Sequence, residues 1–228
     1  MVSITPREKE YADFAKAFAP LQQALSKEEF PAQSYDWDIK PLNEGLTSSS
    51  RVQYVGKAAN FLRLGYHFTG SMAVLETLLR YDYFWTKIRV QGGAYGAFTG
   101  FNRNGFMYFG SYRDPNLKET LDVFDGTADY AANFTASERE MDKFIIGVDT
   151  PMTPMMKGDA AATCYLRGIT EADRQQRRDE ILATRQEDIR ALAPLIDACM
   201  KENVLCVFGN DEKIAEAKDV FGAIKPAL

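Results

Sequence analysis

Apolar residues recur at helical spacing over several long stretches of the chain and alternate with polar residues over only a few short ones. The first long stretch follows Thr5-Pro6-Arg7-Glu8, a capping box with proline at the first helical position, and predicts a helix over about residues 6–26. Residues 30–37 are turn-rich and carry aromatic side chains, which is typical of a connector. We therefore expect residues 1–40 to form a helix and a connector to a preceding domain, and residues 41–228 to form one α+β domain.

Five short segments have the character of strands. Two lie in a stretch that lacks helical period and is rich in Ser, Thr, Val and Tyr. Two more flank Asn102–Gly105, whose Asn-Gly pair is a strong signal for a hairpin turn. The last is a short apolar run late in the chain. The five predicted strands span residues 46–50, 52–58, 94–101, 106–112 and 204–208.

Helical periodicity predicts further helices around these strands. The longest begins at Ser71 as its N-cap, keeps Trp85 and Ile88 on its buried face, and ends near Val90 because Gly92-Gly93 follows. Few strands and many helices favour a two-layer α+β sandwich, in which helices pack on one face of a mainly antiparallel sheet. The other helices begin near Asp114, Thr135, Thr170, Thr184 and Asp211, and one more runs through Cys164.

Composition and charge exclude several classes of function. The 228 residues are 46% apolar and 26% charged, with a net charge of −5 and no basic run, so nucleic-acid binding has no electrostatic footprint. No apolar run is long enough to span a bilayer, and the polar N-terminus is no signal peptide. The three cysteines, Cys164, Cys199 and Cys206, lack metal-ligand spacing, which predicts thiols in a reducing compartment such as the cytoplasm or an organelle matrix.

The histidine count restricts the metal chemistry. His67 is the only histidine, whereas a catalytic zinc usually has three protein ligands, mostly histidines. We therefore assign no metal ligands to this chain. A single histidine in an aromatic segment is more often a structural or surface residue than a ligand.

The joint between the long helix and the hairpin concentrates the candidate chemistry. Arg89 and Tyr95 flank Gly92-Gly93, so one tight turn can direct a cation and a phenol into the same cleft. The plainer interpretation is an arginine at the negative end of a helix dipole and a tyrosine that packs on its neighbour. A phosphate-binding loop is disfavoured, because the segment runs from helix to strand.

Six segments carry a resemblance to a known family in the same order along the chain. Over roughly residues 44–225 the sequence resembles the C-terminal domain of insulinase/pitrilysin-type zinc metallopeptidases, specifically the presequence-protease branch. The segments are Gly56–Asn60, Tyr83–Arg89, the Arg-x-x-Gly-Gly-Ala-Tyr-Gly motif of Arg89–Gly96, Ser111–Leu117, Gly168–Arg174 and Arg178–Thr184.

The resemblance implies half of an active site. In this family two homologous halves close around a peptide, and the zinc lies in the N-terminal half on a His-x-x-Glu-His helix that is absent here. By resemblance, Arg89 and Tyr95 are the catalytic pair that binds the substrate and stabilises the tetrahedral intermediate, and Gly92, Gly93 and Arg113 contact substrate. The implied partners are a peptide and the zinc-bearing half, and the isolated chain is expected to be inactive.

Two other functions stay open at this point. The chain could be a non-catalytic peptide-binding or assembly subunit, as in two-chain members of the resembled family. It could also be a structural domain in which Arg89 and Tyr95 only pack.

Overall fold

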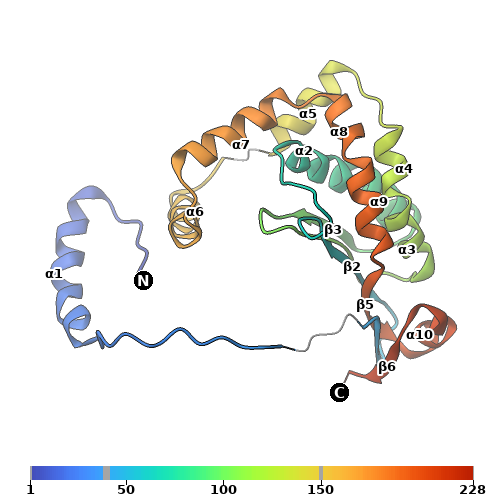
Figure 1. The fold of residues 1–228 in the computed structure, drawn as a ribbon, viewed down its shortest axis with the longest axis horizontal. Coiled ribbons are helices and arrows are strands. Elements are labelled where there is room, and N and C mark those ends of the chain that lie inside the picture. The colour runs from blue at the N-terminus through green and yellow to red at the C-terminus, as the bar shows by residue number, and fades with distance from the viewer. Residues whose placement is uncertain (1, 38–41, 149–150, 228) are drawn as a thin grey trace. The chain divides into compact units, whose positions relative to one another are not determined.

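A six-stranded mixed sheet is the centre of the structure, a computed structural model that describes residues 2–37, 42–148 and 151–227 (Figure 1). The strand order is β3-β4-β2-β5-β1-β6. Three neighbouring pairs are antiparallel, and β1 runs parallel to both β5 and β6. The predicted α+β class with a mainly antiparallel sheet is therefore confirmed. The strands are β1 Glu44–Ser48, β2 Tyr54–Asn60, β3 Gly96–Phe101, β4 Phe106–Tyr112, β5 Val204–Asn210 and β6 Ala223–Pro226.

The described chain divides into two compact units. One combines residues 1–40 with 151–173, and the other combines residues 41–150 with 174–228. The smaller unit contains α1 Glu8–Ala24 and α6 Pro154–Arg167, neither of which has a buried residue. The predicted domain boundary between residues 40 and 41 lies outside the described residues.

The larger unit packs its helices against one face of the sheet, where α2, α3 and α9 contact the strands (Figure 1). The core between these layers includes the fully buried Val55, Phe84, Phe109, Phe124 and Val207. In the described part of the chain, no helix is both long and apolar enough to cross a membrane. The helices are α2 Ser71–Leu78, α3 Lys118–Asp125, α4 Thr127–Ala132, α5 Glu138–Val148, α7 Glu171–Ala183 (which begins in the smaller unit), α8 Gln186–Ala191, α9 Ala193–Lys201 and α10 Asp211–Glu216, with a 3₁₀ turn at Lys218–Val220.

The long predicted helix after Ser71 exists but changes type along its length. After α2 the chain continues as two π-helical segments, Leu79–Tyr83 and Trp85–Gln91. Gly70 is the N-cap, and Ser71 is the first helical residue rather than the cap. The prediction that Trp85 is buried was wrong, because 43% of its surface is exposed. The wider π-helical turn changes the angular spacing of side chains and removes Trp85 from the face that an α-helix would bury.

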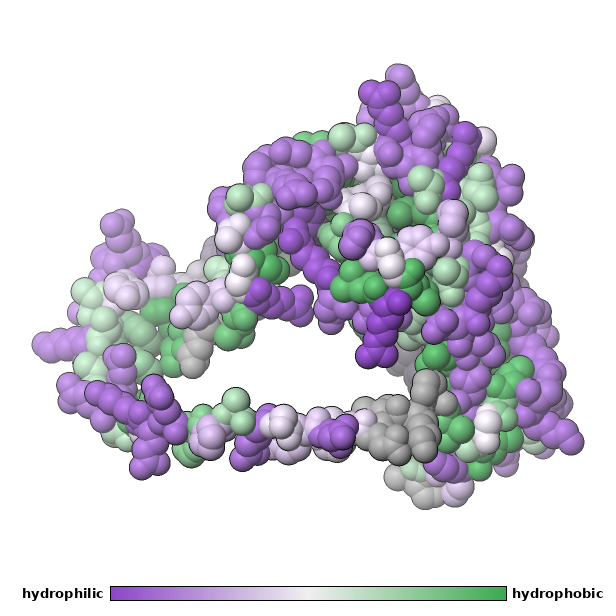
Figure 2. All heavy atoms as spheres, viewed as in Figure 1, coloured by the Kyte–Doolittle hydropathy of each residue, from purple (hydrophilic) through white to green (hydrophobic). Residues whose placement is uncertain are grey.

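The helix expected to begin at Thr184 differs from the sequence prediction in two respects. Thr184 does not cap α8: its hydroxyl donates to the carbonyl oxygen of Glu180 at 2.8 Å, and Arg185 is the N-cap. The single helix expected there is divided at Leu192 into α8 and α9. Strand β6 was not predicted, because this exposed segment has no alternation of apolar and polar residues. Helix α7 was predicted. Figure 2 shows that its surface is hydrophilic, and Ile181 is the one buried residue of this helix.

Candidate functional site

Two glycines build the turn between the π-helical segment and β3. The amide of Gly93 donates to the Arg89 carbonyl at 3.0 Å, and the amide of Ala94 donates to the Ile88 carbonyl at 3.1 Å. Gly93 has a φ of +80°, which side chains rarely adopt. A Cβ on Gly92 would lie 2.6 Å from the carbonyl oxygen of Ile88. Both positions therefore require glycine, for different reasons.

This turn and the end of β4 form one open pocket. Arg89, Gly93, Tyr95 and Arg113 line it and enclose about 510 Å³ together with Val52, Trp85, Val90 and Ala94. Four of the five residues predicted from the sequence therefore lie around one hollow, and Gly92 supports the turn beside them without lining the hollow.

Arg89 lies over an aromatic ring at one side of the pocket. Its guanidinium carbon is 4.0 Å from the centroid of the Trp85 ring, within the range of a cation–π contact. This contact limits the freedom of the guanidinium, which keeps its N–H donors for a ligand. The two residues are four positions apart, a spacing that brings helical side chains together.

Tyr95 is held by its backbone and exposes its side chain. Its amide donates to the carbonyl oxygens of Tyr112 at 3.1 Å and Arg113 at 3.4 Å. Its side chain is 68% exposed, and its ring meets the Tyr112 ring edge to face at 5.7 Å. Among the described residues, no group forms a hydrogen bond with its hydroxyl. The phenol is therefore free to donate to a ligand.

Arg113 occupies a strained backbone conformation that its neighbours hold in place. Its φ of +50° lies in the left-handed region, which costs a residue other than glycine roughly 1–2 kcal/mol. The next residue, Asp114, is fully buried and exchanges two backbone hydrogen bonds with Gln53, at 2.7 and 2.9 Å. Such strain persists where the surrounding structure enforces it, and it clusters at functional sites.

The side chain of Asp114 organises the loop after Arg113. Oδ1 accepts a hydrogen bond from the Asn116 amide at 2.9 Å, and Oδ2 accepts one from the Thr120 hydroxyl at 2.7 Å. Asn116 in turn donates from Nδ2 to the carbonyl oxygen of Gly92 at 2.6 Å. Asp114 was expected to cap the following helix directly, whereas Leu117 is the N-cap of α3. Its carboxylate instead orders the loop after Arg113, and Asn116 connects that loop to the turn before Tyr95.

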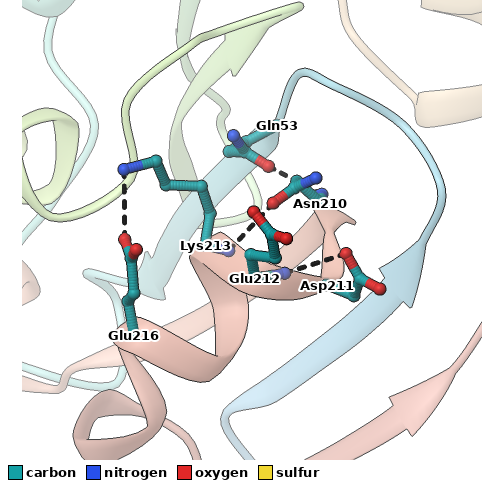
Figure 3. A network of polar contacts seen from close by, with 6 residues as sticks. All are labelled: Gln53, Asn210, Asp211, Glu212, Lys213 and Glu216. Carbon is teal, nitrogen blue, oxygen red and sulfur yellow. Dashed lines mark hydrogen bonds and ion pairs between the residues drawn. The ribbon is translucent and has the colours of Figure 1, made fainter.

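A second polar network anchors the other side of this loop (Figure 3). The Gln53 side-chain oxygen accepts a hydrogen bond from the Asn210 amide at 2.7 Å. Asn210 caps α10 by accepting from the Lys213 amide at 2.9 Å, and the Lys213 ammonium pairs with Glu216 at 3.1 Å. Gln53 thus ties the end of β5 to the segment beside Val52, which lines the pocket.

The described residues offer little to a metal ion or a thiol nucleophile. They include no group of three or more His, Cys, Asp or Glu side chains that could hold a metal ion, and His67 is an exposed residue. Burial raises the pKa of the Cys199 thiol to about 11, and burial followed by the charge of Glu44 raises the pKa of Cys206. Both shifts favour the unreactive thiol form.

Sequence reasoning missed two residues of the site. Trp85 was assigned to the core, although its spacing of four residues from Arg89 was a usable signal for the stack. Asn116 had no such signal, because its contact with Gly92 depends on how two distant loops meet.

Comparison with known proteins gives a consistent result. A family described as the PreP C-terminal domain matches residues 43–209. Protein HypA of Clostridium perfringens is 41% identical over 232 residues, and presequence protease 1, chloroplastic/mitochondrial, of Arabidopsis thaliana is 37% identical over 202 residues. These alignments cover 100% and 84% of this chain but only 24% and 19% of the relatives. The chain therefore spans about a quarter or less of their length.

Solved structures show the same fold at low sequence identity. Pitrilysin matches with a TM-score of 0.57 and 14% identity, over 88% of this chain and 23% of pitrilysin. The peptidase M16 inactive domain from Pseudomonas fluorescens matches with a TM-score of 0.58 and 12% identity, over 87% of this chain and 50% of that structure.

Proposed function

The chain belongs to the PreP C-terminal domain family, and we propose that it is the non-zinc domain of a presequence-protease-like metalloendopeptidase. In that role it closes the peptide chamber opposite a zinc-bearing half. The proposed partners are a peptide substrate and that half of the same polypeptide. The proposed setting is a reducing compartment, and relatives of this chain are named as chloroplastic or mitochondrial presequence proteases.

We assign the two central roles to Arg89 and Tyr95. The Arg89 guanidinium is always charged and donates to the carbonyl oxygens of a bound peptide. The Tyr95 hydroxyl donates to the oxyanion that develops on the carbonyl under attack. Gly92 and Gly93 give the backbone its turn, and Arg113 supplies a second cation that contacts the substrate.

One observation carries this proposal. Arg89, in the π-helical segment Trp85–Gln91, and Tyr95, in the bend just before β3, line the same open pocket, and the Tyr95 hydroxyl has no partner among the described residues. Tyr95 is 68% exposed, so its hydroxyl is accessible to a bound peptide. A hydroxyl kept free at the mouth of a pocket is what an oxyanion donor requires.

Zinc does not fit the residues of this chain. Its single histidine and the lack of a clustered ligand set in the described part of the chain leave no place for the ion. In the proposed enzyme the zinc-bearing half supplies the metal and the attacking water. This chain supplies positioning and electrostatic stabilisation, so we expect it to be inactive when isolated.

The experiment is the substitution Tyr95→Phe in the complete polypeptide that carries this domain. Removing one oxyanion donor lowers turnover on the order of 100-fold, while the free energy of unfolding stays the same because no hydrogen bond of the fold is lost. Tyr81→Phe is the matched control, since Tyr81 is also exposed (62%) and lies outside the pocket. Unchanged turnover in Tyr95→Phe would exclude the oxyanion role.

A non-catalytic peptide-binding subunit is the second candidate. The likeness to a solved domain whose name calls it inactive keeps this possibility in view. The two candidates differ in what the complete polypeptide encodes. A His-x-x-Glu-His motif in the same polypeptide supports the enzyme, and peptide binding without that motif or any hydrolysis supports the subunit.

A further inference from the structure

The pocket around Arg89 has an unusual charge balance for an acidic chain. Among the described residues that line it, Arg89 and Arg113 are cationic and none is an Asp or Glu. The whole chain carries a net charge of −5. Two cations without a counter-charge, in a hollow on an acidic protein, indicate a ligand that brings negative charge.

Neither guanidinium is neutralised by a carboxylate in the described part of the chain. Elsewhere on the surface such pairs are common: Arg80 pairs with Glu76 at 2.7 Å, and Lys118 pairs with Asp219 at 2.7 Å. Arg89 instead lies on Trp85, and Arg113 extends from a left-handed backbone position. Both residues are exposed, so their charges are accessible to a bound anion.

Neighbouring groups restrict the movement of both arginines. The guanidinium carbon of Arg89 lies over the Trp85 ring, 4.0 Å from its centroid. The backbone of Arg113 is fixed on one side by the bond from the Tyr95 amide and on the other by the paired backbones of Gln53 and Asp114. Donors that are ordered before binding lose less conformational entropy when a ligand arrives.

We propose that this pocket binds a carboxylate group of the peptide, carried either by its C-terminus or by an Asp or Glu side chain. The inference rests on the proposed function and names the chemical class that the site selects. Arg89 and Arg113 offer planar forks of N–H donors that match the two oxygens of a carboxylate. Val52, Val90 and Trp85 line the pocket beside them and can contact the apolar atoms next to the carboxylate.

The residues that line the pocket favour a carboxylate over a basic group. A lysine or arginine side chain would find no carboxylate in the lining and would meet two like charges. A neutral amide would leave one guanidinium without an acceptor of equal strength. A hydrogen bond to a charged group is stronger than one between neutral groups, so a carboxylate is expected to bind about tenfold or more tightly than its amide.

Three small peptides test the proposal on the 228-residue chain. They are N-acetyl-tetraalanine as the free acid, the same peptide as the C-terminal amide, and N-acetyl-Ala-Glu-Ala-Ala amide. The reporter is the indole N–H signal of Trp85 in ¹H–¹⁵N NMR. The chain has two tryptophans, and Trp37→Phe leaves Trp85 as the only one. Trp37 is 70% exposed and belongs to the other compact unit, so this change leaves the pocket intact.

The free acid is expected to bind about tenfold more tightly than the amide, and added salt should weaken its binding. If the glutamate peptide binds as tightly as the free acid, the pocket also accepts a side-chain carboxylate. If it binds only as tightly as the amide, the pocket selects the C-terminal carboxylate. Both results support carboxylate recognition. In Arg113→Gln the preference should disappear, whereas in Arg63→Gln, an exposed arginine outside the pocket, it should remain.

Two results would overturn carboxylate recognition. One is that all three peptides bind equally and that Arg89→Gln weakens the binding of each to the same extent. Arg89 would then bind peptides without selecting a carboxylate. The other is the absence of any shift of the Trp85 signal at 10 mM peptide, on the order of the weakest specific affinity expected. The proposed function is tested separately, by the turnover of Tyr95→Phe in the complete polypeptide.

Discussion

The side chain of Asn116 donates a hydrogen bond to the carbonyl oxygen of Gly92 at 2.6 Å, across 24 residues of sequence. This bond joins the loop that follows β4 to the turn that precedes β3. Because Arg113 lies just before Asn116 and Tyr95 lies just after Gly92, the relative position of the two candidate side chains depends on it.

Asn116→Ala should loosen the pocket as well as the fold. The loss of a half-buried hydrogen bond leaves the Gly92 carbonyl without its partner and should lower the free energy of unfolding by roughly 1–2 kcal/mol. Urea unfolding measures this change, and the Trp85 indole signal reports the pocket. Asn133→Ala is the control, because Asn133 makes a comparable bond to the Asp129 carbonyl at an exposed helix end. If the Trp85 signal is unchanged in Asn116→Ala, Asn116 does not position the pocket.

The two glycines of the turn should respond differently to alanine. Gly93→Ala places a side chain at a φ of +80° in free space, with the nearest atom at 3.5 Å, and should cost roughly 1 kcal/mol. Gly65→Ala is its matched control, because φ is +85° there and no atom lies within 4 Å. Gly92→Ala should cost more than either, because the new Cβ meets the Ile88 carbonyl at 2.6 Å. Equal losses for Gly92→Ala and Gly65→Ala in thermal unfolding would contradict the steric argument.

The buried lysine of β2 gives a test of charge burial. Lys57 is 3% exposed, and its ammonium pairs with Asp125 at 2.5 Å, whose side chain is 51% exposed. Asp125→Asn leaves the buried ammonium without a counter-charge and should destabilise the domain by several kcal/mol. Lys57→Met keeps the volume and removes the charge, so its effect should be much smaller. Denaturant midpoints that rank the two variants in the opposite order would show that the ion pair stabilises the fold.

The stability of the domain should fall at alkaline pH. Burial raises the pKa of Cys199 from 9.0 to about 11, so the folded state holds this proton more tightly than the unfolded state. The contribution of Cys199 is fully present below pH 9 and is lost as the pH rises from 9 towards 11, by roughly 1–2 kcal/mol. Burial and the hydrogen bond to Asp82 raise the pKa of Tyr130 as well, with the same sign.

Cys199→Ala isolates the thiol from the tyrosine. Its loss of packing is independent of pH, so the variant should show a smaller fall in the free energy of unfolding between pH 8 and pH 10.5 than the unmodified chain. Parallel curves for the two proteins would mean that Cys199 does not ionise differently in the folded and unfolded states.

The sequence predicted most of this fold where local signals were strong. The Asn104-Gly105 turn placed the β3–β4 hairpin, and the periodicity of Leu75 and Ile88 placed the long helix, because local geometry determines both. The π-helical turn under Trp85 could not be predicted, since apolar spacing does not separate an i→i+5 bond from an i→i+4 bond. Strand β6 was missed because only its parallel pairing with β1 makes it a strand.

The candidate site divides in the same way. The glycine pair and the motif around it indicated that Arg89 and Tyr95 lie at one cleft, and both line the same pocket. The positive φ of Arg113 and the contact of Asn116 with Gly92 arise from the meeting of distant loops, which no local pattern encodes.

The order of the sheet also governs when the domain can be completed during synthesis. Strand β1, near the start of the domain, pairs only with β5 and β6, whose residues come about 160 to 180 positions later. The hairpin and β2 can associate early, but β1 stays without a partner until β5 has left the ribosome. Contacts so distant in sequence slow folding, and an unpaired strand edge promotes aggregation meanwhile. A chain truncated before β5 should therefore accumulate as aggregate rather than as a smaller domain.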